Sequence, residues 1–216
     1  ARHGDIVGEW TTPTYAHAGG ARGHIWRPIP ASVQHVAAVI FGRDGAVFRS
    51  LNLLVHLCNI WLVTWVARRW GAHPMVAMSA ALVWSTHPSM PEAVCWSSDI
   101  YDLMATTCML LALGIVGARA NAKHALLLGV LLLCACLCKE SSLALVPVLV
   151  ILTIYRQGWP SAFRVGTSVS TGAAAYWILH QMVTEQGYLD TLAQGAWTAM
   201  VDAGLMVFGW IIYAPP

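Results

Sequence analysis

Seven apolar runs separated by short polar segments constrain the fold of this chain more than any other feature. Only 10% of the 216 residues are charged and 57% are hydrophobic, whereas soluble domains carry about 25% charged residues. Because a backbone in lipid must satisfy its own hydrogen bonds, we expect each run to be a helix. The sequence therefore predicts an all-α, polytopic transmembrane helix bundle of about seven spans. The runs are approximately 46–67, 74–86, 102–118, 124–138, 141–155, 163–183 and 197–213.

The apolar stretch 124–155 is best interpreted as two helices. Its 32 residues exceed the ~20 that one crossing needs, and a single helix would place Lys139 and Glu140 in mid-bilayer at a cost of several kcal/mol. We therefore expect a tight turn at these residues, with Ser141 and Ser142 capping the second helix. Residues 1–45 are less hydrophobic and are predicted to be an outer loop with a short interfacial helix at 31–41. Residues 46–216 form the predicted bundle.

Charge is distributed unevenly between the two predicted faces. If the helices alternate in direction, three short loops collect basic residues on one face, which the positive-inside rule makes cytoplasmic. These residues are Arg68, Arg69, Arg119, Lys123, Arg156 and Arg164. All ten carboxylates then fall on or near the outer face: Asp5, Glu9, Asp44, Glu92, Asp99, Asp102, Glu140, Glu185, Asp190 and Asp202. We therefore expect charge chemistry or cation binding on the outer side. We expect no nucleic-acid partner, because the basic residues form no cluster.

The outer loop 87–103 is the most acidic part of the chain. It contains Glu92, Asp99 and Asp102, and two prolines prevent a continuous helix. Such a carboxylate cluster can act as a base, bind a divalent ion or hold an arginine. The alternative is a solvated loop that happens to be acidic, and both interpretations stay open.

A stripe of polar residues runs along the first apolar helix. Arg49, Asn52, His56 and Asn59 recur at spacings of three and four, which places them on one face. Interhelical hydrogen bonding is the preferred interpretation for Asn59, and a core position for His56. Arg49 and Asn52 lie near the outer end, where contact with a headgroup or phosphate is an equal alternative.

Two further cationic positions are candidates for phosphate binding. Lys139 is a point charge of the kind that binds phosphate, with Glu140 orienting it; the alternative is a turn in which the two charges compensate each other. Arg27 precedes Pro28 at the predicted membrane surface, and arginine suits bidentate phosphate recognition. No metal site is predicted, because the histidines show no metal-ligand spacing and Cys134, Cys136 and Cys138 would point about 200° apart in succession on a helix.

Four ordered segments resemble one family. WRPIPASVQHVAAVIFG, FRSLNLLVHLCNIWLVTWVARR, HPSMPEAVCWSSDIYDLMA and CKESSLALVPVLVIL are similar to the GT-C superfamily of polytopic glycosyltransferases, and most to its TMTC-like branch. The resemblance covers about residues 24–160. The matching positions are Arg27, Pro28, Asn52, His56, Asn59, His87, Pro88, Glu92, Trp96, Asp102, Lys139, Glu140 and Pro147.

The resemblance implies an integral-membrane glycosyltransferase. Such an enzyme moves a sugar, usually with inversion, from a polyprenyl-phosphate donor to a protein or glycan acceptor on the periplasmic or luminal face of the bacterial inner membrane or the ER membrane. A carboxylate accepts the acceptor's proton, and a cationic group or a divalent cation steadies the leaving phosphate. The partners that the resemblance implies are membrane lipids and the lipid-linked sugar donor. It implies Glu92 and Asp102 as catalytic residues. The implied substrate- or phosphate-binding residues are Arg27, Arg49, Asn52, His87, Lys139 and Glu140.

The resemblance also implies that the chain is a fragment. The family carries its catalytic acid just after a first helix, whereas only Asp5 and Glu9 precede Arg27 here. We therefore expect the first helix and the main catalytic base to lie upstream of Ala1. The alternative function is a non-catalytic GT-C-like membrane subunit that binds protein partners in a larger complex.

Overall fold

A computed structural model describes residues 6–11, 25–116 and 121–184. Within these ranges the chain forms helices and no strand, which confirms the all-α prediction. The helices are α1 (Ile6–Thr11), α2 (Pro28–Phe41), α3 (Gly45–Arg69), α4 (Pro74–Ser85), α5 (Met90–Cys95), α6 (Ile100–Val116), α7 (Ala122–Cys138), α8 (Leu145–Gln157) and α9 (Trp159–Val183). Two short 3₁₀ turns, η1 (Ser97–Asp99) and η2 (Glu140–Ala144), precede α6 and α8.

Local sequence signals place several helix ends. The Asp44 side chain accepts a hydrogen bond from the Ala46 amide at 3.0 Å and caps α3. Asn121 does the same for α7 through the His124 amide at 2.9 Å. Gly42 ends α2 and Gly158 ends α8 with positive φ angles of 86° and 80°, a conformation that glycine adopts without steric cost.

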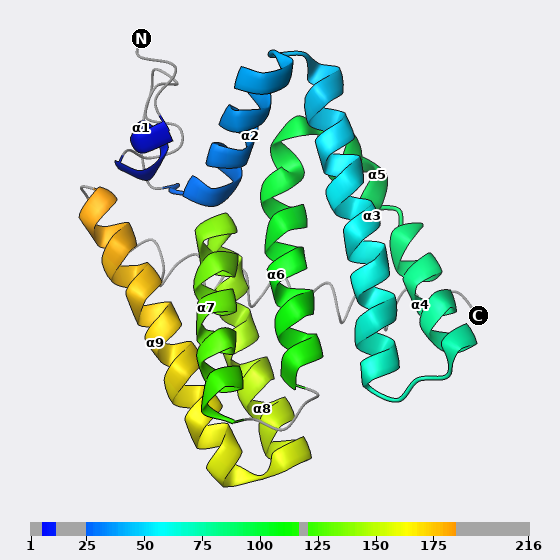
Figure 1. Cartoon of the computed structure of the whole chain (residues 1–216), viewed down its shortest axis with the longest axis vertical. Coiled ribbons are helices and arrows are strands. Elements are labelled where there is room, and N and C mark those ends of the chain that lie inside the picture. Colours follow the sequence, from blue (N-terminus) through cyan, green and yellow to red (C-terminus); the bar gives the residue numbers. More distant parts are fainter. Residues whose placement is uncertain (1–5, 12–24, 117–120, 185–216) are drawn as a thin grey trace, which may run out of the picture.

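Successive long helices run in alternating directions, so that α3 and α6 are parallel to each other, as are α7 and α9 (Figure 1). α7 packs against α6 and α9, α3 packs against α6 and α4, and α8 packs against α9. The largest core cluster lies among α6, α7, α8 and α9, where Leu128, Leu132, Leu149 and Val165 are almost completely buried. The α2 helix lies across one end of this arrangement.

Glycines allow α7 and α9 to approach closely. A Cβ atom added to Gly172 would lie 2.4 Å from the Gly129 carbonyl oxygen, and one added to Gly129 would lie 2.6 Å from Ser168 Oγ. Neither position can accept a larger side chain without separating the helices. Small residues at helix interfaces are typical of membrane bundles, where packing stabilises association.

The helical segments agree with six of the seven predicted apolar runs. In the described part of the chain, three helical segments are long and apolar enough to cross a membrane: Gly45–Arg69, Ser97–Val116 and Glu140–Gln157. The α4 and α7 helices are apolar but shorter, and α9 is long but interrupted by Ser and Thr. The run 197–213 lies outside the described residues. The number of membrane crossings stays a prediction.

Two local predictions have different outcomes. The interfacial helix predicted at 31–41 is present as α2, which begins three residues earlier because prolines suit a first helical turn. The prediction that Ser141 and Ser142 cap the next helix is wrong. The η2 turn intervenes, α8 begins at Leu145, and the Ser142 hydroxyl donates to the Ala135 carbonyl at 3.1 Å. The division of the chain at residue 45 stays a prediction.

Five basic residues of the described ranges gather at one end of the bundle: Arg68, Arg69, Lys123, Arg156 and Arg164. There Arg69 Nε donates to the Gly114 carbonyl at 2.8 Å and Gln157 Nε2 to the Val116 carbonyl at 3.0 Å. The Arg156 guanidinium stacks over the Trp70 ring at 4.2 Å. These contacts join the ends of α3, α6 and α8. The described carboxylates lie toward the other end: Glu9, Asp44, Glu92, Asp99, Asp102 and Glu140. Arg119, Asp5, Glu185, Asp190 and Asp202 lie outside the described residues, and the side of the membrane on which each end lies stays a prediction.

Candidate functional site

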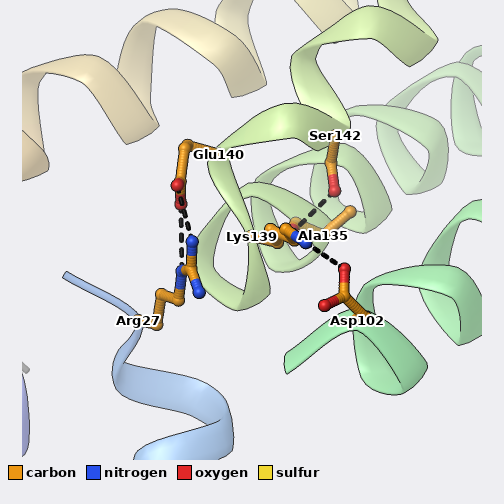
Figure 2. A network of polar contacts seen from close by, with 6 residues as sticks. All are labelled: Arg27, Asp102, Ala135, Lys139, Glu140 and Ser142. Atoms are coloured by element: carbon orange, nitrogen blue, oxygen red, sulfur yellow. Dashed lines mark hydrogen bonds and ion pairs between the residues drawn. The ribbon is translucent and has the colours of Figure 1, made fainter. Parts of the chain in front are cut away.

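Two ion pairs lie side by side at the carboxylate-bearing end of the bundle (Figure 2). Arg27 donates from Nε to Glu140 Oε2 at 3.0 Å and from Nη2 to Glu140 Oε1 at 2.6 Å. Lys139 Nζ forms an ion pair with Asp102 Oδ1. The first pair is bidentate, which is the stronger and more directional geometry. Three elements thus meet here: the segment before α2, the first turn of α6 and the link between α7 and α8.

The backbone at Lys139 explains why adjacent residues have different partners. Lys139 is extended, with φ −157° and ψ 127°, so its side chain and that of Glu140 point in different directions. Glu140 therefore reaches Arg27, and Lys139 reaches α6. The prediction that Glu140 orients Lys139 is wrong, because the ion pairs connect separate elements and do not form within the dipeptide.

The Arg27 pair is the more enclosed of the two. The side chains of Arg27 and Glu140 are 14% and 29% exposed, against 30% for Lys139 and 45% for Asp102. The Arg27 guanidinium also lies 5.4 Å from the centre of the Tyr101 ring, a cation–π geometry. Arg27 therefore holds the start of α2 on the bundle, and the Lys139 pair is the one that meets solvent.

Lys139 retains hydrogen-bonding capacity in this arrangement. An ammonium group has three donors, and one is directed at Asp102. Asp102 lies in the first turn of α6, where the helix dipole favours a negative charge. The carboxylate can thus fix the position of the ammonium group while its remaining donors face an anion.

Asn52 connects α3 to the acidic loop. Its side chain is fully buried, and its Nδ2 atom donates to the carbonyl oxygens of Trp96 at 2.7 Å and Ala93 at 3.3 Å. Both carbonyls lie near the end of α5, and the Trp96 carbonyl also accepts from the Asp99 amide at 3.0 Å. Asn52 therefore positions the loop that carries Glu92. A direct contact between Asn52 and substrate stays a prediction.

The other predicted site residues lie on the surface near this loop. Glu92 and Arg49 are exposed, and neither side chain forms a hydrogen bond or ion pair with another described residue. Burial, followed by the negative charges of Asp102 and Glu92, raises the pKa of the Asp99 carboxyl, so these two carboxylates lie close enough to act on it. The His87 ring is 2.8 Å from the Ser89 hydroxyl, in the turn between α4 and α5. The roles of these residues in catalysis or binding stay predictions.

The remaining members of the polar stripe on α3 join helices. Asn59 donates to the Leu103 carbonyl at 2.9 Å and accepts from the Thr107 hydroxyl at 2.7 Å. His56 is buried and stacks on Trp84, with ring centres 5.4 Å apart. The predictions of interhelical hydrogen bonding and of a core histidine are confirmed. Thr107 and Tyr101 were not predicted, because an apolar run carries no signal for which of its residues face a partner across helices.

The described residues do not include a group of three or more His, Cys, Asp or Glu side chains arranged to hold a metal ion. Asp102 and Glu140 are each bound to a cationic side chain. A divalent cation at this site therefore stays a prediction.

Comparison with known proteins gives one informative likeness. Over 137 residues the chain is 30% identical to protein O-mannosyl-transferase Tmtc1 from Drosophila melanogaster. The match covers 62% of this chain and 16% of the relative, so the chain spans much less than that protein's length. No protein-family model matches the chain, and no solved structure matches it. The chain is thus similar to a glycosyltransferase in sequence and has the apolar helices of a membrane protein.

Proposed function

We propose that this chain is part of a membrane glycosyltransferase of the GT-C type that moves a sugar from a polyprenyl-phosphate donor to an acceptor hydroxyl. The observation that carries the proposal is the convergence of four residues from the predicted motifs, Arg27, Asp102, Lys139 and Glu140, in two adjacent ion pairs. The likeness to a protein O-mannosyl-transferase supports it and makes a protein hydroxyl the expected acceptor.

In this proposal Lys139 stabilises the phosphate that leaves the sugar. Bond cleavage transfers negative charge to the phosphate oxygens, and a prepositioned ammonium group stabilises that charge without reorganisation. Asp102 holds Lys139 in place and does not itself contact the phosphate. Arg27 and Glu140 keep the start of α2 against the bundle and so shape one wall of the site.

Glu92 is the described carboxylate best placed to meet the acceptor. It is exposed on the loop that Asn52 fixes, and it is not neutralised by a described cation. A carboxylate there can accept a hydrogen bond from the acceptor hydroxyl and orient it for attack. The main base, expected upstream in the family, would then remove the proton.

The proposed reaction takes place at the periplasmic or luminal face. The basic end of the bundle is the expected cytoplasmic end, because Lys and Arg in short loops set orientation. The two ion pairs lie at the opposite end. A lipid-linked donor would present its phosphate at this depth, near the membrane surface.

A non-catalytic subunit is the second candidate, and one observation favours it. Among the described residues at the site, Arg27 and Lys139 are each paired with a carboxylate, as in a structural contact between elements. In that case the ion pairs stabilise a scaffold for protein partners, and their neutralisation does not affect sugar transfer.

Transfer of a labelled sugar from polyprenyl phosphate by the complete protein distinguishes the two candidates. Glu92→Gln and Asp102→Asn should each lower transfer by about 10²-fold, as misplacement of a reacting or positioning group does. Asp44→Ser is the matched control, because it removes a carboxylate at the same end while serine still caps α3. Unchanged transfer in both site variants, with normal membrane insertion, would reject catalysis at this site.

A further inference from the structure

Two cysteine side chains meet between α6 and α7. The thiols of Cys108 and Cys138 form a hydrogen bond with each other across the two helices. Cys138 is the last residue of α7 and is completely buried, whereas Cys108, in the middle of α6, is partly exposed. Both are free cysteines. They form a facing pair in which one sulfur is accessible and the other is not.

The packing of α6 places Cys108 on the side that meets α7. Thr107 and Gly114 contact α3 and so mark the opposite side of the helix. Cys108 shares its side with Ala105 and Ala112, because the three residues recur at spacings of three and four. Both alanines are almost completely buried. Small residues on this side let the two helices approach closely enough for two short side chains to meet.

The arrangement suits a disulfide bond between these two cysteines. A disulfide requires Cβ atoms that face each other and sulfur atoms about 2.05 Å apart. Thiols that already meet across a helix interface need only a short closing movement to reach that separation. Cys134, one turn earlier on α7, also lies near Cys108, but the hydrogen bond of Cys108 is formed with Cys138. The contacts therefore favour one pairing.

We propose that Cys108 and Cys138 form a disulfide that joins α6 to α7, by exchange with a disulfide oxidant. The thiolate of Cys108, the accessible sulfur, attacks one sulfur of the oxidant, forms a mixed disulfide and releases the other sulfur as a thiolate. The sulfur of Cys138 then attacks Cys108 Sγ and releases the second thiolate. The two thiol protons of the protein pass to these two thiolates, so the protein is oxidised by two electrons and the oxidant is reduced by two.

The disulfide restrains the helices that supply the Lys139 ion pair. Cys138 directly precedes Lys139, and Cys108 follows Asp102 by six residues, which is about 9 Å along the helix axis. The carboxylate-bearing end of the bundle is the expected outer end, and the periplasm and the ER lumen are compartments in which disulfides persist. The inference concerns a covalent bond between two helices and does not rest on sugar transfer.

Peptide mapping of the complete protein tests this proposal. The protein is purified in a mild detergent, incubated with glutathione disulfide, treated with N-ethylmaleimide to block the remaining thiols, and digested without reductant. A linked peptide pair that contains Cys108 and Cys138 should appear and should be lost on reduction with dithiothreitol. Modification of both cysteines by N-ethylmaleimide, with no linked pair, would overturn the proposal.

Hydrogen exchange of the oxidised protein tests the restraint. Amides of residues 102–108 and 134–139 should exchange at least about tenfold more slowly than in the reduced protein, because the cross-link limits the opening of both helices. Unchanged exchange in protein that carries the linked pair would overturn the proposed restraint of the ion pair.

Cys134→Ser is the matched control for Cys108→Ser. Both cysteines are partly exposed, so both substitutions change one sulfur atom without opening the completely buried core. Cys108→Ser should abolish the linked pair, and Cys134→Ser should retain it at the yield of the unmodified protein. A link between Cys108 and Cys134 of equal yield in the unmodified protein would overturn the assignment. Loss of the Cys108–Cys138 link in Cys134→Ser protein that elutes as the unmodified protein does would overturn it as well.

Discussion

Substitution of Gly114 by alanine should locally destabilise the contact between α3 and α6. A methyl group at this position would lie 1.8 Å from Trp65 Cζ3 and 2.3 Å from Trp65 Cη2. Carbon atoms pack at about 3.5–4.0 Å, so the indole ring must move by roughly 2 Å. Arg69 lies over the same ring at 5.6 Å and donates to the Gly114 carbonyl, so the movement also disturbs that hydrogen bond.

The expected cost follows from three contributions. Overpacking costs about 1–3 kcal/mol, and loss of a hydrogen bond from a charged group costs about 1.5–3 kcal/mol. Alanine stabilises a helix interior by about 1 kcal/mol relative to glycine, which offsets part of this loss. Because the ring movement only weakens the hydrogen bond, the net loss of local stability should be about 2–3 kcal/mol.

Amide hydrogen exchange on the complete protein in detergent measures this loss. A decrease of 2–3 kcal/mol corresponds to exchange faster by about 30- to 150-fold, since about 1.4 kcal/mol is a factor of ten. The faster exchange should be confined to residues 60–69 and 109–116. Gly166→Ala is the control, because its methyl would meet Val150 Cγ2 at an ordinary 3.6 Å. Equal exchange in the two variants would refute the packing of Trp65 on Gly114.

Two further predictions concern polar contacts between elements. The losses of stability caused by Arg27→Gln and Glu140→Gln should not be additive, because each substitution breaks the same bidentate pair. Hydrogen exchange at the start of α2 should give a coupling energy of about 1–3 kcal/mol. Additive losses would mean that the pair does not form. Asn59→Ala should destabilise α6 by about 0.6–1.7 kcal/mol, the range for membrane interhelical hydrogen bonds. Thr107→Ala should destabilise α6 less than Asn59→Ala does in the same assay. An equal or larger loss of stability would contradict the contacts described for Asn59.

The helices could be predicted from the sequence because apolar runs in a charge-poor chain leave few other structures. The end of α7 at Cys138 and the start of α3 at Gly45 agree closely with the predicted runs. The turn at Lys139 and Glu140 could be predicted, and the structure confirms it, but its extension as η2 to Ala144 could not, since it involves Ser142 reaching the Ala135 carbonyl of the preceding helix. The number of membrane crossings stays a prediction, because apolar composition alone does not fix helix length.

The site residues could be named from the sequence, but their partners could not. Arg27 and Glu140 are 113 positions apart, and the sequence contains no signal that pairs them. The predicted pairing of Lys139 with Glu140 rested on adjacency, which fails in an extended backbone. Asn52 was expected near the end of its helix that meets the 87–103 loop, and it lies there, but its carbonyl partners depend on how that loop folds back onto α3.

The most direct test of the proposed function compares two lysines at opposite ends of α7. Lys139 follows the last residue of α7 and pairs with Asp102, whereas Lys123 is exposed in its first turn. Transfer of a labelled sugar from polyprenyl phosphate should fall by about 10²- to 10³-fold in Lys139→Gln of the complete protein, the usual cost of removing one stabilising donor, and should be unchanged in Lys123→Gln. Unchanged transfer in Lys139→Gln, or an equal loss in Lys123→Gln, would contradict a phosphate site at the ion pairs.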